Sequence, residues 1–186
     1  MTEPGQWSPE EVLAAAAAGD ASALRQLYDD LAPAVHGYLR YRGAEEPEDL
    51  TSEVFLAVFP RLDSVTGGRA GLRSLVFSVA HARLVDDLRR RSRRPGLTAY
   101  DAEQDARTTP SSEDQALDAL GLAQVTRLLD HLPEAQREVL ALRHRADLSI
   151  EQVAELLGRT SGAVKQLQRR ALLTLRDVLA REGVTP

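Results

Sequence analysis

The C-terminal part of the chain contains side chains whose types and spacing suit the recognition of duplex DNA. At 100° per residue, a helix over residues 161–180 has an apolar stripe on one side and a mostly polar stripe on the other. The polar stripe consists of Gly162, Lys165, Gln166, Arg169, Leu173 and Arg176. Arg and Lys pair with guanine edges or phosphates, and Gln pairs with adenine. The first backbone amides of this helix, near Thr160 and Ser161, suit a phosphate.

The elements that must position this stripe form a helix-turn-helix pattern. Ser149 and Gln152 make a capping box for a helix over 150–157, Gly158 ends it, and Thr160 can cap the next helix. A helix after such a short turn can enter the major groove of DNA. Leu173 does not fit a DNA contact and suits a protein partner. The competing interpretation is a solvated amphipathic helix.

A second basic segment covers residues 64–95, which carry a net charge of +6 beside the pair Gly67-Gly68. Such a segment can hold the phosphates of a single strand, and a glycine-rich loop can form a pocket for a flipped base. The candidate residues are Gly67, Gly68, Arg69, Arg73, Arg83, Arg89 and Arg90. Arg83 can also pair with Asp86 or Asp87 along a helix, which supports the helix. We expect Arg69, Arg73, Arg89, Arg90 and Arg91 to lack acidic partners of this kind.

A third candidate surface lies on a helix predicted over residues 48–62. Its outer side presents Asp49, Ser52, Glu53 and Leu56. Two carboxylates four residues apart can meet a basic partner helix, and a leucine beside them can supply an apolar anchor. A catalytic carboxylate pair is disfavoured, because neither a third polar group nor a glycine-rich pocket accompanies it. The remaining alternative is an ordinary solvated face.

Composition excludes several classes of function. The 186 residues contain no cysteine, so disulfides, thiolate nucleophiles and Cys-based zinc sites are excluded. The four histidines lack metal-ligand spacing, and no apolar run approaches a membrane span. The net charge of -5 argues against a polybasic protein that coats nucleic acid. Along the chain, the charge is -8 over 1–63, +6 over 64–95, -5 over 96–118 and +2 over 119–186. This distribution matters more for binding than the total.

The chain as a whole predicts an all-α fold with two small helical domains. We expect helices over 9–18, 20–39, 48–62, 72–93, 117–132, 133–145, 150–157 and 161–180, with Pro33 kinking or splitting the second. Residues 64–71 are expected to form a loop. The predicted domains cover 8–95 and 117–182, and residues 96–116 form an acidic, flexible linker.

Several stretches in the two halves of the chain together carry a resemblance to a known family. Region 4 of bacterial sigma factors is resembled by residues 132–143 (LPEAQREVLALR), 148–158 (LSIEQVAELLG), 162–165 (GAVK) and 169–172 (RRAL). Residues 48–56 (EDLTSEVFL) and 74–91 resemble the family's region 2. Both halves occur in the family's order, and the similarity is greatest to the extracytoplasmic-function (ECF) group.

The resemblance implies a sigma factor, a non-catalytic subunit without a cofactor that gives RNA polymerase its promoter specificity. It implies that Asp49, Ser52, Glu53 and Leu56 bind the largest-subunit coiled coil of core polymerase. The basic segment would read and open the minus-ten element. Lys165, Gln166 and Arg169 would read the minus-thirty-five element, Arg170 and Arg176 would hold phosphates, and the flap region of polymerase would be a further partner. The linker would thread the polymerase cleft.

Two positions depart from the family pattern, and one alternative function stays open. Leu75 replaces a usual tryptophan, which repacks the core, and Ala82 replaces a usual asparagine, which removes a polar group near the melted strand. The alternative is a stand-alone helix-turn-helix regulator that binds an operator without polymerase. Such a regulator is expected to be dimeric, whereas a sigma factor is expected to be a monomer. We further expect a cytoplasmic protein, no membrane segment, and a separate anti-sigma protein as an optional partner.

Overall fold

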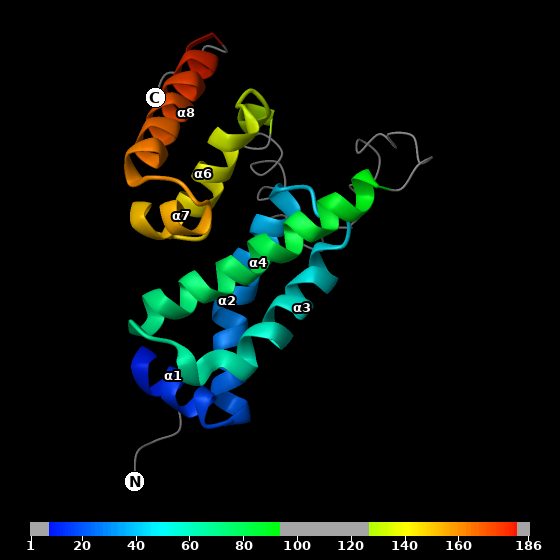
Figure 1. Ribbon diagram of the computed structural model, residues 1–186, viewed down its shortest axis with the longest axis vertical. Coiled ribbons are helices and arrows are strands. Elements are labelled where there is room, and N and C mark those ends of the chain that lie inside the picture. The colour runs from blue at the N-terminus through cyan, green and yellow to red at the C-terminus, as the bar shows by residue number, and fades with distance from the viewer. Residues whose placement is uncertain (1–7, 94–126, 182–186) are drawn as a thin grey trace, which may run out of the picture.

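The computed structural model describes residues 8–93 and 127–181. Every regular element in these two ranges is a helix. They are α1 (Pro9–Ala17), α2 (Ala21–Tyr41), α3 (Pro47–Val58), the 3-10 helix η1 (Phe59–Ser64), α4 (Gly68–Ser92), α6 (Glu134–His144), α7 (Ile150–Leu156) and α8 (Ser161–Arg181). We call residues 8–93 the N-terminal bundle and residues 127–181 the C-terminal unit (Figure 1). The all-α prediction is therefore confirmed; the predicted linker lies outside the described residues.

Local sequence signals set the helix starts of the N-terminal bundle. The Ser8 side chain accepts a hydrogen bond from Glu11 N–H while the Glu11 carboxylate accepts from Ser8 N–H, which completes a capping box. The Asp20 carboxylate caps α2 by accepting bonds from the amides of Ser22 and Ala23. Pro33 lies inside α2 without splitting it, so the helix continues to Tyr41.

Apolar packing between α2, α3 and α4 forms the bundle core. Tyr38 and Phe77 are fully buried and meet edge to face with ring centroids 5.8 Å apart. Val54, Val76 and Leu84 are also fully buried. This packing covers the side of α4 that carries Leu72, Val76, Phe77, Ala80 and Leu84.

The start of α4 differs from the prediction, because the helix begins at Gly68 rather than near residue 72. Gly67 has φ +79° and Gly68 has φ +60°, values that glycine adopts without strain. A Cβ atom on Gly71 would lie 1.7 Å from the carbonyl oxygen of Thr66. Most of the expected loop over Gly67–Gly71 is therefore the tight first turn of α4. The helical segment before it also differs from the prediction, because η1 continues to Ser64 and the third helix was expected to end near residue 62.

The C-terminal unit has the predicted helix-turn-helix arrangement. Ser149 and Gln152 form the capping box of α7, and Gly158 lies in the turn at φ +60°. Thr160 Oγ1 then accepts a hydrogen bond from Ala163 N–H at 3.2 Å. Val164 and Ala171 are fully buried on the inner side of α8. This side packs against α6 and α7, which leaves the opposite side of α8 to solvent.

The two units pack against each other. Most of their buried apolar side chains belong to one continuous cluster, which runs from the N-terminal bundle to α6, α7 and the first turn of α8. Leu132, Leu140 and Ala171 form a second, smaller cluster within the C-terminal unit. In Figure 1 the C-terminal unit lies over α2 and α4. The contact bears directly on which candidate surfaces are open to a partner.

Candidate nucleic-acid interface

The outer side of α8 is the most open of the three candidate surfaces. Lys165, Gln166, Arg169 and Arg170 are all exposed. Within the described residues, the three cations of this group make no ion pair. Arg176 lies 3.8 Å from Asp177, and both side chains are about two-thirds exposed at 67% and 62%, so the pair is weak. These donors are therefore available to phosphates and base edges.

An apolar strip continues the same side of α8 toward its C-terminal end. Leu172 is 48% exposed and Leu173 is 39% exposed. They line a shallow groove together with Lys165, Gln168, Arg169 and Arg176. Exposed leucines among cations suit a protein partner better than a DNA groove.

The predicted acidic surface is exposed on the outer side of α3. Asp49, Ser52 and Glu53 are exposed, and Leu56 is 73% exposed, the highest value among the large apolar side chains described. Leu50, Val54 and Val58 face the core, as the periodicity predicts. The Ser52 hydroxyl donates to the carbonyl of Glu48 at 3.2 Å, so it is turned back to its own helix.

The basic residues of α4 are mostly engaged with protein groups, contrary to the expectation that they lack partners. Arg69 pairs with Asp30 at 2.8 Å, and Arg73 Nε donates to the carbonyl of Ala146 at 2.5 Å. Arg91 pairs with Asp87 at 3.3 Å and also donates to the carbonyl of Gly43. The Asp30 carboxylate and the carbonyls of Ala146 and Gly43 come from other elements, whose positions only the tertiary fold determines.

The remaining α4 candidates are divided between paired and unpaired side chains. Arg83 pairs with Glu53 of α3 at 3.7 Å, whereas the sequence predicted pairing with Asp86 or Asp87. Arg89 and Arg90 are exposed and make no ion pair within residues 8–93 and 127–181. The C-terminal half of α4 therefore keeps free cations, and the N-terminal half does not.

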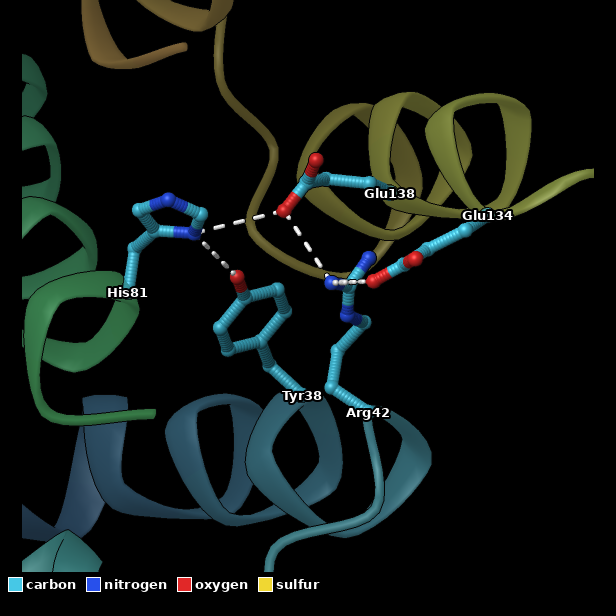
Figure 2. A network of polar contacts seen from close by, with 5 residues as sticks. All are labelled: Tyr38, Arg42, His81, Glu134 and Glu138. Carbon is cyan, nitrogen blue, oxygen red and sulfur yellow. Dashed lines mark hydrogen bonds and ion pairs between the residues drawn. The ribbon is translucent and has the colours of Figure 1, made fainter. Parts of the chain in front are cut away.

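A polar network between the two units was not anticipated from the sequence. Arg42, which follows α2 directly, pairs with Glu138 at 3.2 Å and with Glu134 at 3.4 Å, both on α6. His81 Nδ1 of α4 lies 3.4 Å from Glu138 Oε1 and 3.1 Å from the Tyr38 hydroxyl (Figure 2). We call these five residues the Arg42 network.

Burial determines the electrostatics of the Arg42 network. The Arg42 side chain is 8% exposed and the Glu138 side chain 15%, so their attraction is little screened by water. Burial raises the pKa of Tyr38, and it lowers the pKa of His81 below its ordinary value. The Arg42 charge also lowers the pKa of His81, while the Glu138 carboxylate opposes the shift. Neutral His81 is thus favoured beside Arg42.

The sequence contains no local signal for the Arg42 network. Arg42 and Glu134 are 92 residues apart, so no helical periodicity relates them.

Residues 8–93 and 127–181 contain no group of three or more acidic or histidine side chains placed to hold a metal ion. None of the helices in those ranges is long and apolar enough to cross a membrane.

Comparison with known proteins identifies the two units. Residues 27–94 match the Sigma-70 region 2 model, and residues 128–177 match the Sigma-70 region 4 model. The chain is 31% identical over 180 residues to the ECF RNA polymerase sigma factor SigD of Mycobacterium tuberculosis, covering 94% of this chain and 85% of that protein. The chain belongs to the ECF sigma factors. As a sigma factor it directs RNA polymerase to promoters in transcription initiation.

Other relatives agree with this assignment. The ECF RNA polymerase sigma factor ShbA of Streptomyces griseus is 34% identical, with coverage of 85% of this chain and 88% of that protein. The ECF RNA polymerase sigma factor BldN of Streptomyces coelicolor is 31% identical over 91% of this chain, which spans 65% of BldN. Among solved structures, CnrH in complex with the cytosolic domain of CnrY has the same fold, with a TM-score of 0.65 at 23% identity, covering 94% of this chain and 99% of that one.

Proposed function

We propose that this sigma factor divides its work among the three surfaces predicted from the sequence. The outer side of α3 binds core RNA polymerase, α4 holds the opened minus-ten strand, and the outer side of α8 reads the minus-thirty-five duplex. The observation that carries the proposal is the opposite charge of two exposed helix faces, acidic with Leu56 on α3 and basic on α8. The linker over 96–116 connects domains bounded at 8–95 and 117–182 and follows the polymerase cleft.

The α3 surface suits a basic helical partner such as the largest-subunit coiled coil. Asp49 and Glu53 are exposed one helical turn apart, and Leu56 projects beside them. An exposed apolar side chain next to charges is typical of an anchor that becomes buried on binding, with the charges steering the encounter. Glu53 must exchange its long contact with Arg83 for the partner, which costs little because both side chains are nearly half exposed.

The α8 surface suits the major groove of duplex DNA. Lys165, Gln166 and Arg169 lie on the exposed side in the first half of α8, where a recognition helix meets base edges. Arg170 and Arg176 lie at positions that suit phosphates. Leu172 and Leu173, further along, suit the flap region of polymerase. A stand-alone regulator would use the same helix, but it would leave the acidic α3 surface without a role.

The α4 surface suits a single strand along its exposed basic side. Arg89 and Arg90 are open, and Arg69, Arg73 and Arg83 add charge once their present partners are exchanged. We also propose that the subunit acts in the cytoplasm, as a monomer, and without catalytic activity of its own. The solved structure of the sigma factor RpoE with the anti-sigma factor NepR from Bartonella quintana, at 20% identity and a TM-score of 0.63, supports considering an anti-sigma partner here.

The α3 assignment is tested by charge reversal in the full-length chain. Asp49→Arg combined with Glu53→Arg is expected to weaken binding to core polymerase by at least tenfold, because like charges then face the basic partner. Transcription from a genomic promoter library with core polymerase should fall in parallel. Glu45→Arg, at another exposed acidic position just before α3, is the matched control and should bind normally. Unchanged core binding by the double variant would show that α3 is not the docking surface.

A further inference from the structure

The C-terminal unit contacts the first turns of α4 at two backbone carbonyls. Arg73 Nε donates to the Ala146 carbonyl in the loop between α6 and α7, at 2.5 Å. Gln152 Nε2 of α7 donates to the Ala70 carbonyl at 3.1 Å. These two bonds place the α6–α7 loop over the segment from Ala70 to Arg73.

The same segment belongs to the surface proposed for the minus-ten strand. Arg73 directs its guanidinium at a carbonyl oxygen, which is the type of acceptor that a phosphate oxygen would replace. While the α6–α7 loop occupies this site, the Nε donor of Arg73 is not available to a phosphate. The C-terminal unit and a DNA strand therefore compete for Arg73.

The Arg42 network holds the two units in this arrangement from the other end of the interface. Arg42 bridges from the end of α2 to Glu134 and Glu138 of α6, and His81 of α4 reaches the same Glu138 carboxylate (Figure 2). A charged pair with little exposure to water is strong only while both partners are in place. Loss of Glu138 alone would leave the Arg42 charge without its best partner.

The interface also contains buried polar atoms without hydrogen-bond partners in the described residues. They are Arg42 Nη1 and the Tyr41 hydroxyl, which lie beside Glu134 and Arg137 of α6. A buried donor or acceptor that lacks a partner carries an energetic cost, and water would satisfy it if the units separated. The contact is therefore suited to opening, unlike a fully satisfied core.

We infer that the described arrangement is a self-covered state, in which the C-terminal unit shields the Arg73 end of the strand-holding surface and the Arg42 network keeps it closed. This inference rests on the proposed role of α4. Separation of the units, on binding core polymerase, would free Arg73 for the promoter strand. The apparent affinity for single-stranded DNA would then depend on the fraction of molecules in which the two units are separated.

The test uses the full-length chain, which has no native cysteine. Ala17→Cys and Ala180→Cys, both exposed and one in each unit, allow a fluorescence-transfer distance to be measured. The wild-type chain should show a single, narrow distribution of distances between the two labels, and Glu138→Gln should broaden it. The same substitution should strengthen binding of a fluorescent oligothymidine strand by about tenfold, because loss of one charge-assisted contact increases the fraction of open molecules by about that factor. Arg42→Met should do the same. Glu155→Gln, exposed on α7, is the control and should change neither quantity.

Each outcome decides the inference. A wider distance with tighter strand binding supports it. An unchanged distance in both variants, or a wild-type chain already open, overturns it. A wider distance without tighter binding overturns the shielding of Arg73. Thermal melting by circular dichroism identifies a variant that fails to fold, in which case the other variant decides. Failure of the proposed function is seen separately, as absence of core binding and promoter-specific transcription in the wild-type chain.

Discussion

Helices α4 and α8 both carry several arginines, but the structure uses these cations differently. On α4, Arg69 and Arg73 contact an aspartate and a backbone carbonyl of neighbouring elements. On α8, Lys165 and Arg169 are exposed and make no ion pair within the described residues. A count of charges along the sequence treats the two helices alike. Their availability to DNA depends on contacts with neighbouring elements, within the bundle for Arg69 and between the two units for Arg73.

With the roles proposed for α8 and α4, this difference corresponds to the order of events in initiation. Duplex DNA is the first nucleic acid that a promoter offers, and an open α8 surface can meet it directly. A single strand exists only after the duplex opens, so a surface for it has no use in the free subunit. Shielding the N-terminal part of α4 would also limit nonspecific binding of single strands.

The largest expected effect concerns leucines on the two helices. Leu84→Ala should lower the free energy of unfolding by about 2–5 kcal/mol, because Leu84 is fully buried between the helices of the bundle. Leu173→Ala on α8 is the matched control, since Leu173 is 39% exposed, and it should change stability by less than about 0.5 kcal/mol. Urea denaturation measures both. Equal losses would mean that α8 is packed as deeply as α4.

The next effect concerns the cations of α8. Lys165→Ala and Arg169→Ala should each weaken binding of holoenzyme to promoter duplex by about 1–3 kcal/mol if the side chains read bases. Competition between promoter variants distinguishes the mechanisms, because a loss spread equally over all sequences identifies a phosphate contact. Arg127→Ala, exposed on the same unit but outside α8, is the control. Normal binding by both variants would remove α8 from the DNA interface.

The smallest effect is a pH dependence of the contact between the units. The pKa of His81 is lowered from 6.5 in the closed arrangement, so the closed form binds a proton less readily than an open form. The closed form should be fully stabilised above about pH 6.5 and lose stability as the pH falls below it. The groups facing His81 are Tyr38 of α2, Arg42 directly after α2, Glu134 and Glu138 of α6, and Arg89 of α4 itself.

Fluorescence transfer between the labels at Ala17→Cys and Ala180→Cys measures this pH dependence. The mean distance should increase on acidification in the wild-type chain, and His81→Gln should flatten the response because glutamine does not titrate. A wild-type distance that is constant across this range would contradict the assigned role of His81. Melting curves at each pH separate opening of the interface from loss of the fold.

Much of the fold follows from local signals in the sequence. The caps at Ser8, Asp20 and Ser149 and the left-handed glycine at Gly158 are short-range features, and the structure has each of them where it was predicted. The inner sides of α3 and α8 follow from helical periodicity. The start of α4 was not predicted, because consecutive glycines usually indicate a loop. The structure shows that Gly71 lies in the first turn of α4, where a side chain would collide with the backbone of Thr66.

The candidate site was less predictable wherever it depends on contacts between distant segments. Exposure of Leu56 follows from the phase of α3, and exposure of Arg169 from the phase of α8. The partners of Arg73 and Arg42 come from the other unit, and no spacing rule relates residues so far apart. The central difference between α4 and α8 therefore required the tertiary structure.

Arginine modification by phenylglyoxal, mapped residue by residue with mass spectrometry, tests that difference most directly. In the free full-length chain, Arg169 and Arg170 should react rapidly, while Arg73 and the nearly buried Arg42 should react slowly. Glu138→Gln should accelerate modification of Arg73 and leave Arg169 unchanged. If Arg73 in the wild-type chain reacts as fast as Arg169, the N-terminal part of α4 is open in the free subunit and the account is wrong.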